Sequence, residues 1–224
     1  TPLTALALAS LLDDVARQFP EAPPHLSTVL MGGRDVGEWL AQDERIPLVS
    51  ATGSTRMGKQ VAEACAKRLT RTILELGGNN AMIVAPSADL EMAVRAITFS
   101  AVGTAGQRCT TLRRLFVHDS VYDQLIPRLK KIYAGLPVGN PLSEGTLVGP
   151  LVDQAAFDAM QTALAAAQQD GGKVEGGVRV IVAGCENGYY VRPSLVEMPS
   201  QTATMHHETF APIMYIVRYS DLQQ

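Results

Sequence analysis

Short apolar runs alternate with longer helix-like patterns over the first 78 residues of the chain. Apolar side chains recur at helical spacing in three segments, and β-branched apolar runs separate them. The pattern predicts helices at residues 3–19, 35–41 and 54–69, and strands at residues 27–31, 46–50 and 72–76. Strands and helices that alternate in this way are typical of a parallel α/β sheet.

Gly77-Gly78-Asn79-Asn80 interrupts this alternation and is the candidate boundary between residues 1–78 and residues 79–224. Beyond it, the pattern predicts strands at residues 81–84, 113–118, 173–175, 189–196 and 212–219. It also predicts helices at residues 88–101, from Ser120 onward and at residues 153–169, with Ser87 as the N-cap of the first. Residues 138–150 are rich in glycine and proline and predict a long surface loop.

Composition narrows the class of protein. Apolar residues make up 46% of the 224 residues and charged residues 18%, so the chain can bury a sizeable core. The net charge of -3 gives no reason to expect nucleic acid or a membrane as a partner. Three cysteines without a CxxC pair indicate neither a disulfide framework nor a zinc site, and we expect no metal. We therefore expect a cytoplasmic protein, and two ends that look cut suggest an internal fragment.

Thr52-Gly53-Ser54 follows a predicted strand and opens a predicted helix. A helix N-terminus presents free N–H groups and a partial positive charge, so this position suits a phosphate. Ser54 would cap the helix, and Gly53 would let a ligand approach the backbone. A plain N-cap is the more common role of such residues, and the GxGxxG pattern is absent.

Glu75 lies inside an apolar run, between Leu74 and Leu76, at the end of a predicted strand. If this carboxylate is desolvated or faces a cleft, its pKa rises toward the range of a general base. An edge-strand glutamate that points to solvent is an equally good interpretation of the pattern.

Cys109 follows Arg108 in a segment that begins with Gly106. A neighbouring cation favours the thiolate, which is the nucleophilic form of cysteine. Cys65 falls on the apolar stripe of a predicted helix and Cys185 in a Gly/Asn loop, so Cys109 is the candidate nucleophile among the three.

Glu208 and Phe210 share a face if their segment is extended, so the pair could hold a ribose or make an ordinary loop contact. His206 and His207 would point in opposite directions there, which argues against a shared metal ion.

These motifs occur in one order, Thr52-Gly53-Ser54, Glu75-Leu76-Gly77-Gly78, Gly106-Gln107-Arg108-Cys109 and Glu208-Thr209-Phe210-Ala211-Pro212. The ordered set resembles the aldehyde dehydrogenase superfamily over essentially the whole chain, and its α-aminoadipic semialdehyde dehydrogenase branch in particular. The resemblance implies an α/β fold with part of a Rossmann-type cofactor domain in residues 1–78. Residues 79–224 would form an α/β catalytic domain that is incomplete at its C-terminal end.

The resemblance also implies roles for single residues. Cys109 would add to the aldehyde carbon, and Glu75 would activate the water that hydrolyses the resulting thioester. Arg108 would bind the carboxylate of a semialdehyde substrate. The remaining positions would bind NAD, with NADP left open: Thr52, Gly53, Ser54, Gly33, Gly37, Leu76, Glu208 and Phe210. The complete enzyme would be a homodimer or homotetramer, and we expect the isolated chain to have little activity.

Three other interpretations stay open. The first is an aldehyde dehydrogenase with another substrate, or a CoA-acylating type, which Glu75 argues against because hydrolysis by water needs a base. The second is a catalytically silent chain that serves as a binding or assembly partner. The third is a cysteine hydrolase, which lacks a histidine near Cys109, since His118 lies along the next predicted strand.

Overall fold

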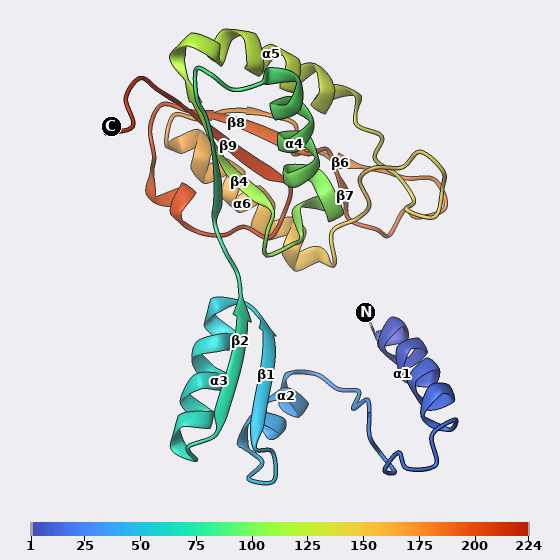
Figure 1. Cartoon of the computed structure of the whole chain (residues 1–224). Helices are drawn as coiled ribbons and strands as arrows, with labels where there is room; N and C mark the ends of the chain where they lie inside the picture. Colours follow the sequence, from blue (N-terminus) through green and yellow to red (C-terminus); the bar gives the residue numbers. More distant parts are fainter. Residues whose placement is uncertain (1, 224) are drawn as a thin grey trace. The chain divides into compact units, whose positions relative to one another are not determined.

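The structure, a computed structural model, describes residues 2–223. The chain forms two compact units, one that ends at Leu76 and one that begins at Gly77. Figure 1 shows the helices and strands of both units, coloured along the chain.

The first unit is built on a strand–helix–strand motif. Strands β1 (Leu48–Gly53) and β2 (Arg71–Leu76) run parallel, and helix α3 (Thr55–Lys67) connects them. Helix α2 (Arg34–Gln42) packs on α3, and helix α1 (Pro2–Ala16) precedes both. Cys65 of α3 is fully buried and directs its thiol to the carbonyl oxygen of Ala41, as expected for a core cysteine.

One predicted strand of the first unit is wrong. Residues 27–31 form no strand, although their apolar run suggested one. Leu30 and Met31 are 61% and 49% exposed, so these side chains lack the neighbouring strand that would pair their backbone and cover them.

The second unit contains a five-stranded sheet with the order β3-β4-β9-β8-β5. Its strands are β3 (Asn80–Val84), β4 (Leu112–His118), β9 (Ile213–Tyr219), β8 (Ser194–Met198) and β5 (Lys173–Glu175). All neighbours are parallel except β5, which is antiparallel to β8. The α/β prediction is therefore confirmed, with a central strand β9 whose first five residues are all buried.

Three long helices cover this sheet: α4 (Leu90–Val102), α5 (Asp119–Gly135) and α6 (Gln154–Gln169). Helices α4 and α5 lie on one side and α6 on the other (Figure 1). The N-cap of α4 is Asp89 and not the predicted Ser87, because the Asp89 carboxylate accepts hydrogen bonds from the N–H groups of Glu91 and Met92. Ionised carboxylates are strong acceptors at a helix start.

The predicted strand at residues 189–196 is two strands. Strand β7 (Tyr190–Val191) pairs with the short strand β6 (Arg179–Val180), which the pattern did not predict, and β8 joins the main sheet. Pro193 stands between them, and proline has no N–H with which to continue a ladder.

Two short 3-10 helices complete the second unit. They are η1 (Gly103–Gly106), which ends three positions before Cys109, and η2 (Ala203–His206), which ends two positions before Glu208. None of the helices in the described part of the chain is long and apolar enough to cross a membrane.

Candidate active site

A left-handed turn precedes Cys109. Thr104, Ala105 and Gly106 have φ angles of 54°, 52° and 69°, in the region that only glycine enters without strain. Gly106 is required there for a second reason, since a Cβ atom would lie 2.5 Å from the backbone of Ala211 and Pro212. Two non-glycine residues held in this conformation indicate a turn that its surroundings fix firmly.

Two amide side chains hold the segment from Gly103 to Thr111, here called the cysteine loop. The Gln107 side chain donates to the carbonyl oxygens of Thr104 and Pro150, both at 3.2 Å, and accepts from the Val152 N–H. Asn80 donates to the carbonyl oxygen of Cys109 at 2.7 Å. The Cys109 residue is exposed, whereas Cys65 is buried and Cys185 is intermediate, so Cys109 is the most accessible of the three thiols.

Arg108 lies beside the thiol and is exposed. Its Nε donates to Thr104 Oγ1 at 2.7 Å, and its guanidinium carbon lies 6.0 Å from the centre of the Phe99 ring. The structure gives no hydrogen bond from its two terminal nitrogens within residues 2–223. These nitrogens can therefore pair with a carboxylate.

Glu208 is anchored through one of its two carboxylate oxygens. Oε1 accepts from the Gly78 N–H at 3.2 Å and from Arg113 Nη2 at 3.1 Å. Within the described residues no hydrogen bond reaches Oε2, so this oxygen is free to accept a ligand hydroxyl. Gly77 makes room for it, because a Cβ atom there would lie 1.9 Å from Oε2.

Arg113 is the functional residue that the sequence analysis missed. Its side chain is 2% exposed, and its guanidinium lies 5.3 Å from the centre of the Phe210 ring. Besides Glu208, it donates to backbone oxygens of Gly78, Gly106, Arg108, Thr209 and Ala211. The available signal was an arginine at an inward position of an apolar strand, since a buried charge needs partners.

The charge of Arg113 is balanced by the groups around it. Burial lowers the pKa of this guanidinium, and attraction to Glu208 and to the Cys109 thiolate opposes that shift. Arg113 thus brings together the predicted site residues of the second unit: Arg108, Cys109, Glu208 and Phe210.

Gly77→Ala is expected to lower the free energy of unfolding by about 1.5–3 kcal/mol, because the displaced Glu208 carboxylate loses its charge-assisted hydrogen bonds. Urea unfolding followed by circular dichroism measures this. Gly135→Ala is the control, since a Cβ atom there meets nothing within 4 Å. Equal stabilities of Gly77→Ala and the parent chain would show that Glu208 is not held as described.

In the first unit, Ser54 caps α3. Its hydroxyl oxygen accepts from the Met57 N–H at 3.2 Å, and Thr52, Gly53 and Ser54 are all exposed. The hydroxyl hydrogen remains free to donate to a phosphate. A Cβ atom on Gly53 would lie 2.6 Å from the terminal methyl group of Met57, so a side chain here would displace the end of Met57.

A groove of about 700 Å³ runs along α2 and α3. Gly37 and Ser54, two of the predicted cofactor positions, line it. Gly33 is the N-cap of α2 and, like Thr52 and Gly53, is not among the lining residues. The groove therefore joins two of the six predicted cofactor positions in the first unit.

Glu75 is exposed, which agrees with the interpretation as a solvent-facing glutamate and not with a desolvated carboxylate. It lies near the end of β2, in register with Thr52 of β1 in a sheet of two strands. Such a sheet offers no further strand to cover the side chain. The neighbouring Leu76 side chain faces Gly58, where a Cβ atom would lie 2.5 Å from it.

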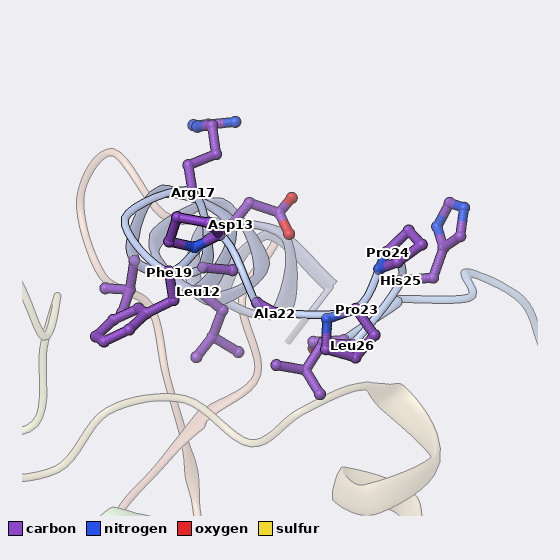
Figure 2. Close-up of a pocket in the computed structure, with 13 residues that line it drawn as sticks. Leu12, Asp13, Arg17, Phe19, Ala22, Pro23, Pro24, His25 and Leu26 are labelled. Atoms are coloured by element: carbon purple, nitrogen blue, oxygen red, sulfur yellow. The ribbon is translucent and has the colours of Figure 1, made fainter.

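A second hollow of about 640 Å³ lies between the end of α1 and the loop that follows. Figure 2 shows Leu12, Phe19 and Leu26 extending to one side of this segment, whereas Arg17 extends away from them. None of the predicted site residues lines this hollow. The described residues also contain no cluster of metal-binding side chains.

The sequence matches known proteins along its whole length. Residues 1–224 match the model of the aldehyde dehydrogenase family. The chain is 43% identical to aldehyde dehydrogenase family 7 member A1 of Pisum sativum, over 100% of this chain and 43% of that protein. It is 42% identical to α-aminoadipic semialdehyde dehydrogenase of Bos taurus, over 98% of this chain and 41% of that protein. The chain thus spans less than half the length of these curated relatives.

Solved structures agree with this match. Lactaldehyde dehydrogenase from Escherichia coli has a TM-score of 0.90 at 34% identity, over 100% of this chain and 46% of that one. PnpE in complex with nicotinamide adenine dinucleotide has a TM-score of 0.92 at 31% identity, over 99% of this chain and 45% of that one. With its whole length matched by the family model, the chain belongs to the aldehyde dehydrogenase family.

Proposed function

We propose that the enzyme containing this chain oxidises an aldehyde to a carboxylate with NAD, through a covalent bond to Cys109. The observation that carries the proposal is the setting of Cys109: an exposed thiol in a firmly held loop that follows a left-handed turn, with a buried guanidinium nearby. A nucleophile needs access to its substrate and a fixed position.

The reaction uses the residues of this chain in sequence. The Cys109 thiolate adds to the aldehyde carbon, and the Cys109 N–H binds the oxyanion that forms. Loss of hydride from that carbon turns the thiohemiacetal into a thioester. Glu75 takes a proton from water, the resulting hydroxide attacks the thioester carbon, and the C–S bond breaks to give the carboxylate and the free thiol.

The residues present fit the cofactor that the family implies. Bound NAD supplies the acceptor for the hydride. The exposed start of α3 suits the pyrophosphate, with Ser54 as a donor, and Gly37 lines the adjoining groove. The free Oε2 of Glu208 can accept a ribose hydroxyl, and Phe210, at 44% exposure, offers an apolar surface beside it. The PnpE complex with nicotinamide adenine dinucleotide supports this choice.

The substrate class we propose is a semialdehyde that carries a carboxylate, with α-aminoadipic semialdehyde as the specific candidate. Arg108 supports this class, because its terminal nitrogens are free and its Nε is held by Thr104. The curated relatives from Bos taurus and Mus musculus that bear the name of this activity support the specific substrate.

Arg108→Ala is expected to raise the KM for α-aminoadipic semialdehyde about 10- to 100-fold, the worth of a charge-assisted hydrogen bond. The KM for an uncharged aldehyde such as hexanal should change less than about twofold. Steady-state kinetics on the complete enzyme measures both values. Arg114→Ala, which removes a charge three positions beyond the loop, is the control. Equal effects of Arg108→Ala on the two substrates would contradict the substrate assignment.

Thiol labelling of the 224-residue chain tests the proposed function without turnover. Iodoacetamide should modify Cys109 before Cys65 and Cys185, and NAD should change the rate at Cys109. Peptide mass spectrometry after timed quenching gives the three rates. Equal rates at Cys109 and Cys185, unaffected by NAD, would argue against a prepared nucleophile.

A further inference from the structure

Arg113 joins three segments that are far apart in the sequence. It donates to the carbonyl oxygens of Gly106 and Arg108 in the cysteine loop. It also donates to Thr209 and Ala211, in the segment at residues 206–211, here called the carboxylate loop. Its remaining bonds reach Gly78 and the Glu208 carboxylate.

The guanidinium is suited to this arrangement in a way that lysine is not. Arginine presents five N–H donors in one rigid plane, whereas lysine presents a single ammonium group on a flexible stem. The shortest of the backbone bonds, to Thr209, is 2.7 Å, and the ion pair with Glu208 is 3.1 Å. With 2% of the side chain exposed, water cannot replace these partners.

We propose that Arg113 is a positioning residue that holds the cysteine loop and the carboxylate loop as one unit, so that Cys109 and Glu208 keep fixed positions relative to each other. The proposal rests on the proposed function, in which Cys109 and Glu208 serve the substrate and the cofactor. It adds that neither loop keeps its position once Arg113 is replaced.

The same bonds explain why the two loops approach so closely. Gly106 faces the peptide bond between Ala211 and Pro212, with no space for a side chain. Arg113 donates to carbonyl oxygens on both sides of this contact, those of Gly106 and Ala211. A backbone contact of this kind needs its carbonyl groups satisfied, because buried unpaired acceptors are costly.

Hydrogen–deuterium exchange on the 224-residue chain tests the coupling without cofactor or substrate. Arg113→Lys keeps the charge but loses the planar set of donors. It should raise exchange about 10-fold or more in the cysteine loop and in the carboxylate loop together, the worth of one or two charge-assisted bonds. Exchange in α5 and β8 should stay unchanged.

Two variants are matched controls. Gln107→Ala removes one bond within the cysteine loop, to Thr104, and the bonds of that loop with Pro150 and Val152, so exchange should rise in that loop alone. Arg114→Lys changes the adjacent arginine, which bonds to Asn79 and Gln201, and should leave both loops unchanged.

Three results of Arg113→Lys would overturn the proposal: no change in either loop, a rise in one loop only, or a uniform rise across the second unit. A uniform rise would mean that Arg113 has only a general structural role.

If Arg113→Lys does not fold, Glu208→Gln is tested in its place. Glu208→Gln weakens the ion pair with Arg113, so exchange should rise in both loops, but less than in Arg113→Lys. The exchange result does not depend on catalysis, so failure of the proposed function and failure of this coupling are distinguishable.

Discussion

Cys109→Ser is expected to abolish NAD-dependent aldehyde oxidation, with a loss of at least about a thousandfold in kcat. A serine hydroxyl stays protonated at neutral pH, so it cannot add to the aldehyde as a thiolate does. The substitution changes one atom and leaves the bonds of the loop intact, since Asn80 binds the backbone carbonyl of residue 109 and not its side chain. NADH absorbance with saturating aldehyde measures the loss.

Cys185→Ser is the matched control for this prediction. Cys185 is intermediate in exposure and lies outside both loops, and its replacement should leave kcat within about twofold of the parent enzyme. If Cys109→Ser retained more than a tenth of the parent activity, Cys109 would not be the nucleophile.

Gly106→Ala is expected to lower the free energy of unfolding by about 2–5 kcal/mol, which combines left-handed strain with overpacking. The backbone at Gly106 has a φ angle of 69°, and the new Cβ atom would lie 2.5 Å from backbone atoms of Ala211 and Pro212. Backbone atoms cannot rotate away as a side chain can, so the two loops must separate. Urea unfolding of the 224-residue chain measures the loss.

Gly145→Ala isolates the part of this effect that comes from the backbone angle alone. Gly145 has a φ angle of 81° but has nothing within 4 Å of a Cβ atom. Its replacement should cost only about 1 kcal/mol. A Gly106→Ala chain no less stable than Gly145→Ala would contradict the close contact between the loops.

The alternation of apolar runs predicted most of the fold. The helix near residues 54–69 is α3 (Thr55–Lys67), because its apolar stripe meets the strands on either side. The prediction of a strand at residues 27–31 was wrong, because an apolar run forms a strand only where another strand pairs with it. The break between β7 and β8 could have been predicted from Pro193, since proline interrupts the hydrogen-bond ladder of a sheet.

The site was less predictable than the fold. Cys109 could be singled out because a cation and a glycine adjoin it in the sequence. The role of Arg113 depends on carbonyl groups from five other residues, and those meet only in the folded chain. The exposure of Glu75 likewise depends on how many strands lie beside β2, and the sequence around Glu75 does not indicate that number.

Trapping the covalent intermediate tests the central claim most directly. A Glu75→Gln variant of the complete enzyme lacks the proposed base and should accumulate the thioester when it is mixed with NAD and aldehyde and quenched in acid. We expect peptide mass spectrometry to find the acyl group of the substrate on Cys109, and only when NAD is present. An acyl group on Cys185, or oxidation of the aldehyde by the parent enzyme after Cys109 has been alkylated, would contradict the account.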